Sequence, residues 1–551
     1  MQSKAGMLAR AGVLAALLVP AAAFAQYESV PGPAAYALQN VTVVQGDGRR
    51  QENVTVVVRG ALIEAIGRDV TVPEDAERLG GDSLIVYPGL VDADGEAAHQ
   101  FPEEEIDRNQ IEIWNAPRSL QGFMPSRRVM AHLEAPGSRV AESRREGIVA
   151  AAVHPHGAMM GGRGVLLLYR KDAELAEQMV VEAALGPRFE LNGGEGVYPN
   201  TLFGVMAFYR QAFEDARHRR QVATARERDP RGSTLPVHDA DYEVLEAVLA
   251  GELPVYFAVE SAPDILRVLG LADEYGFRPL IVGGGEAWKV AAELRERDIP
   301  VLVSTAFDEP RRWKPSEDTA AVEPVDAAAL REKQTLEDVY ANAGRLVEAG
   351  VTVALTSGGT GEILEGARKA VEYGLPESAA LAALTRTPAD LLGIPSVVRL
   401  EPGLAATFLV TTGPLFEDET KVAYTFVEGR VEEASEAPEP GRAEDAVSFG
   451  GEWELTLELE DEPARATLRI EQEGARFTGS FEYRGEEGEV TDGVIDGDEI
   501  SGVVTLEIDE EELEIRLSGT VEGDEASGEA DLGPDGVVRW TARRVGPGGA
   551  R

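Results

Sequence analysis

The chain contains no cysteine among its 551 residues. This absence excludes disulfide bonds, thiolate nucleophiles and zinc sites built on cysteine.

Basic residues are scarce too, because 52 Lys and Arg stand against 97 Asp and Glu, which gives a formal net charge of −45. A surface of that charge repels phosphate backbones, so we expect no nucleic-acid partner. The acids are spread along the whole chain, which favours a role in solubility.

Long apolar runs are missing beyond the amino terminus. Residues 1–25 combine a basic start at Lys4 and Arg10, a short apolar run, and the small-x-small cleavage sequence at Ala23 and Ala25. This pattern predicts a secretory signal peptide, and it is too short for a membrane-spanning helix. We therefore expect an exported protein, periplasmic or extracellular, with no transmembrane segment.

The central part of the sequence alternates short apolar strands with amphipathic helices. The predicted strands are residues 147–153, 253–259, 278–284, 299–305 and 351–357. This alternation predicts an α/β fold with a parallel sheet, most simply a (β/α)8 TIM-type barrel. An open doubly wound sheet is the alternative, but no G-x-G-x-x-G opens a helix, so the usual dinucleotide fingerprint is missing.

Composition and turn residues divide the chain into six predicted segments. They are a signal peptide (1–25), the first part of a β-sandwich (26–85), the barrel with insertions (86–396), the second part of the sandwich (397–432), an acidic linker (433–446) and a C-terminal antiparallel β domain (447–545). Trp453 and Trp540 are predicted to close the core of that last domain, a small barrel or sandwich. A basic helical stretch at 203–229 is predicted to form a cap or dimer face, or to lie solvated.

The stretch YPGLVDA at residues 87–93 resembles the first barrel strand of the amidohydrolase superfamily, typically P-G-hydrophobic-hydrophobic-D-x-H-x-H. Residues 380–394 are similar to the closing helix of that family, and the β-like phrases after them look like its returning strands. The resemblance covers residues 36–432 and is to imidazolonepropionase-like, metal-dependent hydrolases. It implies a barrel with a split β-sandwich, and hydrolysis of carbon–nitrogen bonds other than peptide bonds.

The resemblance also implies a metal centre made of histidines and a late aspartate that handles the proton. The positions that should hold these ligands are occupied by Asp94, Glu96, Ala258, Glu260, Gly283, Gly284 and Gly358. Without imidazoles and the late aspartate, the standard mechanism should not operate, and no cofactor is expected.

Three of the replacing residues are carboxylates: Asp94, Glu96 and Glu260. One interpretation is a rebuilt, all-oxygen site for a divalent cation such as Ca, Mg or Mn, with Zn as a further candidate. The other is a degenerate barrel mouth that is open to water and holds no ion. Like charges gathered at one mouth repel one another unless a cation or a proton lies among them, and this repulsion raises the pKa of at least one carboxyl.

His154, His156 and Ser357 are the remaining candidates, here for ligand binding. His154 and His156 follow a predicted strand with metal-ligand spacing, but Pro155 bends the chain between them, and two loop histidines at the barrel mouth are the simpler interpretation. The sequence after them, GAMMGGRG, is expected to form a tight glycine turn. Ser357 ends a strand, yet the G-x-S-x-G pattern of a nucleophile elbow is absent, because Leu355 stands at its first position.

The sequence thus leaves two functions open, and with them the question of whether the protein is an enzyme. We predict an inactive amidohydrolase-like scaffold, a pseudoenzyme that binds a small molecule or a partner at the barrel mouth. The alternative is a divergent hydrolase that uses a carboxylate-bound divalent cation. A homo-oligomer, or pairing with an active relative, would fit the first function.

Overall fold

The structure is a computed structural model. It describes residues 35–79, 84–102, 106, 111–134, 136–194, 196–231, 237–307, 327–359, 363–418, 420–433, 449–457, 464–473, 476–483, 486–496, 499–508, 511–523, 525–531 and 537–545. The predicted signal peptide, and nearly all of the predicted acidic linker, lie outside the described residues. No helix in these ranges is long and apolar enough to cross a membrane.

Strands from both sides of the central region join in one 8-stranded sheet, with the order β18-β17-β16-β5-β1-β2-β3 and β4 paired to β1. This is how the predicted split β-region is assembled. Its strands are β1 (Ala35–Val44), β2 (Arg50–Arg59), β3 (Leu62–Gly67), β4 (Ala76–Leu79), β5 (Ile85–Pro88), β16 (Phe408–Thr411), β17 (Val422–Val427) and β18 (Arg430–Glu433).

Gly89 connects this sheet to the central region, because β5 ends at Pro88 and β6 begins at Leu90. A Cβ atom on Gly89 would lie 2.5 Å from the side chain of Val149, closer than carbon atoms can approach. Only glycine fits where the two strands meet at such short range. The first half of the YPGLVDA stretch therefore belongs to one sheet and the second half to another.

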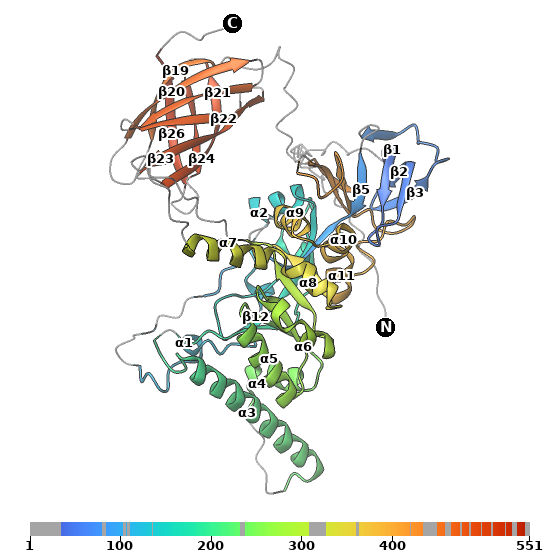
Figure 1. Cartoon of the computed structure of the whole chain (residues 1–551), viewed down its shortest axis with the longest axis vertical. Coiled ribbons are helices and arrows are strands. Elements are labelled where there is room, and N and C mark those ends of the chain that lie inside the picture. The colour runs from blue at the N-terminus through green and yellow to red at the C-terminus, as the bar shows by residue number, and fades with distance from the viewer. Residues whose placement is uncertain are drawn as a thin grey trace, which may run out of the picture.

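Two further sheets form the central region (Figure 1). The 4-stranded sheet has the order β10-β9-β7-β6, and the 6-stranded sheet has the order β15-β14-β13-β12-β11-β8. Their strands are β6 (Leu90–Gly95), β7 (Ile148–Val153), β8 (Met160–Arg163), β9 (Val165–Leu168), β10 (Val180–Glu182), β11 (Pro187–Glu190), β12 (Val255–Val259), β13 (Pro279–Gly283), β14 (Val301–Ser304) and β15 (Val353–Thr356). All five predicted central strands are present.

Two features of the central strands differ from the sequence-based expectation. The predicted glycine turn is wrong in part, because Met160–Arg163 form β8, which pairs antiparallel with β11. Gly164 alone separates β8 from β9, and β9 pairs antiparallel with β7, so this bent segment links the two sheets. Strand β11 was also unexpected, since no strand was predicted between residues 153 and 253.

Neighbouring residues on the central strands pack into different cores. Phe257 and Ile281 belong to the large core shared with the helices. Tyr256, Leu280 and Leu302 belong to a second core, which the strands enclose on their other face. A sheet with an apolar layer on each face has near-continuous apolar strands, as the sequence showed.

Helices flank these strands (Figure 1). They are α1 (Arg118–Gln121), α2 (Ser138–Arg145), α3 (Leu202–Arg228), α4 (Ala240–Leu249), α5 (Ala262–Tyr275), α6 (Ala291–Glu296), α7 (Ala327–Tyr340), α8 (Asn342–Glu348), α9 (Leu364–Glu372), α10 (Glu377–Leu384) and α11 (Arg386–Leu391), with 3-10 turns η2 (Val129–His132), η3 (Ala176–Met179) and η4 (Ala287–Val290). Helix α5 shows why they begin and end where they do. The Ser261 side chain accepts from the Asp264 amide, and Gly276 ends the helix in the left-handed region.

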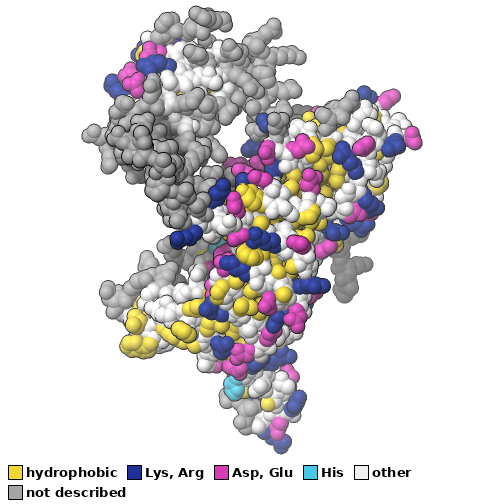
Figure 2. Space-filling view, viewed as in Figure 1, with side chains coloured by type: hydrophobic (Ala, Val, Ile, Leu, Met, Phe, Trp, Pro, Cys, Tyr) yellow, Lys and Arg dark blue, Asp and Glu magenta, His cyan; other side chains and the backbone are white. Residues whose placement is uncertain are grey.

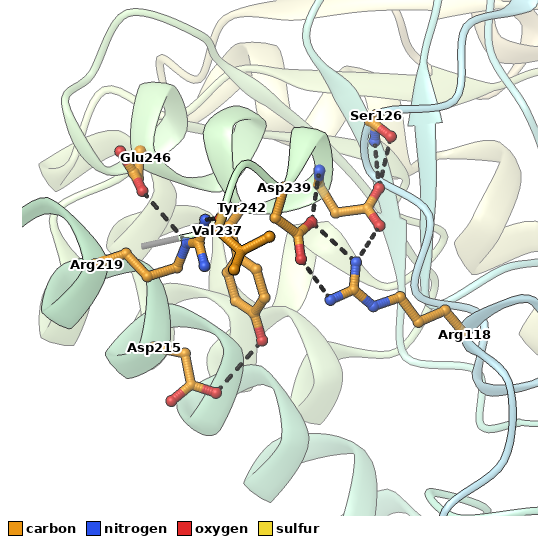
Figure 3. A network of polar contacts seen from close by, with 9 residues as sticks. Arg118, Ser126, Asp215, Arg219, Val237, Asp239, Tyr242 and Glu246 are labelled. Carbon is orange, nitrogen blue, oxygen red and sulfur yellow. Dashed lines mark hydrogen bonds and ion pairs between the residues drawn. The ribbon is translucent and has the colours of Figure 1, made fainter. Parts of the chain in front are cut away.

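A polar network fastens the segment around α1 to α4 (Figure 3). Arg118 donates two hydrogen bonds to the Asp239 carboxylate, at 2.9 and 2.7 Å, and one to Asp241 at 2.7 Å. The Ser126 hydroxyl donates to the other oxygen of Asp241, at 2.6 Å. The part of this segment around Arg118 and Ser126 is thus held against the start of α4.

Strands β19 to β26 close into an antiparallel barrel, one of the two forms predicted for the C-terminal domain. They are β19 (Gly451–Leu457), β20 (Ala464–Glu473), β21 (Arg476–Tyr483), β22 (Glu486–Asp496), β23 (Glu499–Ile508), β24 (Glu511–Glu522), β25 (Glu525–Asp531) and β26 (Val537–Arg544). Trp453 and Trp540 are both buried in its core, as predicted. The Trp453 indole N–H donates to the Phe449 carbonyl, so its polar atom is satisfied.

Candidate functional site

Five polar residues lie at the C-terminal ends of the central strands, and we call them the strand-end site. Asp94 is in β6, Arg188 and Glu190 are in β11, and His154 and Glu260 directly follow β7 and β12. Because the parallel strands end at one edge of the sheets, these side chains converge there. Asp94, His154 and Glu260 were predicted from the sequence, whereas Arg188 and Glu190 were not.

A buried ion-pair cluster lies at the centre of the strand-end site. The Arg188 Nη1 atom donates to Asp94 at 2.6 Å, and its Nε atom donates to Glu190 at 3.0 Å. The Gly157 amide and the Asn192 side chain also donate to Glu190, at 3.1 and 2.6 Å. The side chains of Asp94, Arg188 and Glu190 are only 5%, 8% and 11% exposed. One guanidinium therefore bridges two carboxylates, and nearby N–H groups donate further hydrogen bonds to both oxygen atoms of Glu190.

Burial raises the pKa of Asp94, and the charge and hydrogen bond of Arg188 oppose that rise. The partner is therefore what keeps a carboxylate charged at this depth. The sequence signal for it was the alternation Arg188-Phe189-Glu190, which places two charges on one face of a short strand. Charged residues fully buried in a strand need partners, so this pattern is informative once β11 is recognised.

His154 is buried beside this cluster as a neutral imidazole. Neither ring nitrogen has a hydrogen-bond partner among the described residues, and the ring centroid lies 4.1 Å from that of Tyr256. Burial, and then the charge of Arg188, hold the pKa of His154 well below its ordinary value. A Cβ atom on Gly164 would lie 2.6 Å from the Nε2 atom, so Gly164 makes room for the ring.

His156 lies apart from His154 despite the spacing of two residues. His154 is fully buried, whereas His156 is exposed and lines a cleft of about 460 Å³ together with Phe101, Arg127 and His132. Desolvation within the cleft, and then the charge of Arg188, lower the pKa of His156 to about 4. The guanidinium of Arg127 lies 3.8 Å from the centre of the Phe101 ring, so the cleft presents a cation, an aromatic ring and imidazole side chains.

Glu96 and Glu260 have other partners than Asp94, and neither contacts Arg188 by a hydrogen bond among the described residues. Glu96 pairs with Arg139 at 2.5 Å near the surface. Glu260 accepts a 2.8 Å hydrogen bond from the Gly285 amide, and desolvation raises its pKa. The three predicted carboxylates therefore have three different partners. Within the described ranges, no group of three His, Cys, Asp or Glu residues is arranged to hold a metal ion.

Ser357 joins the last central strand to the first. Its hydroxyl donates to Asp92 at 2.5 Å, and its amide lies 3.3 Å from both oxygens of that carboxylate. Both residues are buried, and burial raises the pKa of Asp92 to about 6. The hydroxyl also accepts from the Gly359 amide. Ser357 thus has a structural role at the seam between β15 and β6, and its ligand-binding role stays a prediction.

Comparisons with known proteins agree with this architecture. Residues 314–431 match the model of the amidohydrolase family. The fold is similar to that of an amidohydrolase from Thermotoga maritima MSB8, with a TM-score of 0.57 and 22% identity over 72% of this chain and 99% of that one. These matches give the chain an α/β fold that contains a TIM-type barrel and a β-rich domain.

Two other solved structures are more distant. They are a prolidase complexed with N-methylphosphonate-L-proline (TM-score 0.43, 13% identity, 72% and 99% covered) and a zinc-bound adenosine deaminase from Xanthomonas campestris (TM-score 0.40, 15% identity, 72% and 92% covered). At such low TM-scores they add nothing to the fold assignment. No curated protein sequence matches the chain.

Proposed function

We propose that this chain is an exported, metal-independent member of the amidohydrolase superfamily that binds a small molecule at the barrel mouth without hydrolysing it. Members of this superfamily typically use a divalent metal ion. The residues at the strand-end site do not fit that ion, and the reason is the position of Arg188.

The observation that supports the proposal is the Asp94–Arg188–Glu190 cluster. Asp94 stands where the resemblance implies the first metal-binding histidine, and its carboxylate is bound by a guanidinium at 2.6 Å. A divalent cation beside Asp94 would face that fixed positive charge at short range in a poorly hydrated site, where repulsion is strong. Arg188 therefore provides the positive charge that a metal ion provides in the relatives.

The same proposal includes the closure of the barrel. Counting the bent segment β8–β9 as one member, the order β6, β7, β9–β8, β11, β12, β13, β14, β15 has eight members. The hydrogen bonds between Ser357 and Asp92 join the last member to the first. The separate core that contains Tyr256, Leu280 and Leu302 supports a layer of side chains inside such a barrel.

The cleft beside His156 is the proposed ligand site. Its cavity of about 460 Å³ falls within the usual range for small-molecule pockets. The Phe101 ring and the Arg127 guanidinium offer stacking and charge, and His132 and His156 offer hydrogen bonds. A screen of small molecules by thermal shift should find ligands whose stabilisation is lost in Arg127→Ala and His156→Ala, with no turnover of the bound compound.

The replacement of the metal by Arg188 is tested by removing the guanidinium. Elemental analysis of natively purified wild-type protein should find no stoichiometric divalent metal, and Ca, Mg, Mn or Zn should not shift its melting temperature. Arg188→Ala should lose about 3–5 kcal/mol of stability, because it leaves two buried carboxylates unpaired. Divalent cations should then raise its melting temperature, by the equivalent of about 2.7 kcal/mol at 100 times the Kd.

Arg163→Ala is the matched control, because Arg163 donates to the carbonyls of Leu185 and Ala184 and not to acids. It should lose stability without gaining a response to cations. If Arg188→Ala folds poorly, Arg188→Gln keeps most of the volume and gives a second measurement. A stoichiometric metal in wild-type protein that Asp94→Asn abolishes would instead establish the divergent, carboxylate-bound hydrolase.

A further inference from the structure

The C-terminal half of α3 is basic in a chain that is otherwise strongly acidic. The formal charge of the whole chain is −45. Between residues 217 and 228, α3 has a single acid, Glu227, and five arginines: Arg217, Arg219, Arg220, Arg226 and Arg228. In Figure 2, Lys and Arg side chains project from the end of the molecule where α3 extends in Figure 1. A local reversal of charge sign is a feature that a partner can recognise.

Three of these arginines line a groove of about 530 Å³ between α3 and the ends of α4 and α5. Arg217, Arg220 and Arg228 share the face of α3 that also bears Gln221 and Thr224. The opposite wall is formed by Glu246 and Leu249 in the last turn of α4 and by the largely buried Tyr275 at the end of α5. The groove therefore combines three arginines with a single acid and apolar surface.

The arginines differ in how far their charge is already compensated. Arg217 donates to the Glu274 carbonyl at 3.0 Å and lies over the Tyr275 ring at 4.4 Å. Arg219 does not line the groove, but it lies 3.8 Å from the groove-lining Glu246 and donates to the Val237 carbonyl at 2.6 Å (Figure 3).

Arg220 and Arg228 are exposed and have no hydrogen bond or ion pair with any residue that the structure describes. The charge of Arg220 acts on Glu246 only through space. Eight residues separate the two, which places them about 12 Å apart along the helix axis. Two exposed arginines without an ion pair among the described residues, at a fixed spacing on one groove wall, are available to an external anion.

We propose that this groove binds an acidic polypeptide segment. Carboxylates of the segment pair with Arg220 and Arg228, and its aliphatic groups pack against Leu249 and the methylene groups of the arginine side chains. A polypeptide has both kinds of group, whereas a polyphosphate or nucleic acid lacks the aliphatic part. A long polyanion would also run beyond the groove onto the acidic remainder of the surface, where it is repelled.

Fluorescence anisotropy with a fluorescein-labelled octamer of glutamate tests the proposal on the full chain. At 150 mM NaCl the Debye length is about 8 Å. A bound peptide therefore interacts with the arginines of the groove, while its repulsion by distant acids is screened. We expect saturable binding that weakens at 500 mM NaCl, and no binding of a glutamine octamer. The double variant Arg220→Glu/Arg228→Glu should raise the Kd by about tenfold or more, equivalent to about 1.4 kcal/mol.

The control variant is Arg78→Glu/Arg145→Glu, which changes the net charge equally at two exposed arginines outside the groove. It should leave the Kd of the octamer nearly unchanged. Equal loss of binding in both double variants would overturn the proposal, since only net charge would then matter. Binding of polyphosphate without binding of the glutamate octamer would overturn it as well, in favour of a polyanion site.

Discussion

At the scale of single residues, His154 links burial to pH dependence. Its ring is fully buried without hydrogen bonds, and burial holds its pKa well below the ordinary value. An unfolded chain takes up a proton on this histidine below about pH 6.5, whereas the folded chain does not. The stability that depends on His154 is therefore present above that pH and is lost as the pH falls, by about 1.4 kcal/mol per unit.

We expect the melting temperature of His154→Leu to rise relative to that of wild type as the pH falls from 7 to 5. Calorimetry of both proteins across this range measures the difference. His218→Leu, at an exposed position of α3, is the control and should follow wild type at every pH. Parallel curves for wild type and His154→Leu would show that the ring becomes protonated in the folded protein.

Some residues of the strand-end site could be predicted from the sequence and others could not. The sequence alone showed that Asp94 and Glu260 depart from the family pattern, because the family motif places histidines at these positions. The compensating residue was not visible, because Arg188 is 94 positions from Asp94 and only the fold brings them together. Strand geometry allowed His154 and His156 to face one site, although two loop histidines were the simpler interpretation. In the structure β7 ends at Val153, and the two rings diverge after it.

At the scale of elements, the Arg118 network should control the mobility of the segment around α1 (Figure 3). Arg118 is 43% exposed, so water screens its ion pairs and its removal should cost about 1 kcal/mol or less. We expect Arg118→Ala to leave the global melting temperature almost unchanged, yet to expose this segment about fivefold more often. Limited proteolysis with chymotrypsin, followed by mass spectrometry, locates and times the cleavage.

Arg399→Ala is the control for that experiment, because Arg399 is exposed and pairs only locally with Glu401. It should leave the cleavage pattern of wild type unchanged. If Arg118→Ala were cleaved no faster than Arg399→Ala, the stacking of the Phe123 and Tyr242 side chains with their other neighbours would be sufficient to hold the segment. The experiment therefore decides whether the ion pairs of Arg118 or the aromatic contacts hold the segment around α1.

Elements with strong apolar character were predictable, and short polar ones were not. The five predicted central strands are continuous apolar runs that have apolar layers on both faces, so their sequences reveal them. Strand β11 has only four residues and two of them are charged, and β8 contains two glycines, so neither shows a strand pattern. Both lie where the parallel order of strands is interrupted, and tertiary pairing determined their conformation.

At the scale of the whole molecule, the charge of −45 is the dominant electrostatic property. The described arginines pair largely with nearby acids, but the excess of acids remains and the like charges repel one another in the folded state. The unpaired arginines on α3 gain significance from this background. Two arginines without ion pairs distinguish this groove from the acidic surface around it.

Self-repulsion of this size predicts that salt stabilises the protein. Raising NaCl from 10 to 500 mM shortens the Debye length from about 30 Å to a few ångströms, which removes the long-range repulsion between acids. We expect the melting temperature at pH 7 to rise steeply at low salt and to level off once screening is complete. Near the sequence pI of about 4.5 the net charge vanishes, so the same titration should give little change there. A rise that continues linearly beyond 500 mM at both pH values would instead indicate ion effects on hydrophobic burial, as sulfate and phosphate exert.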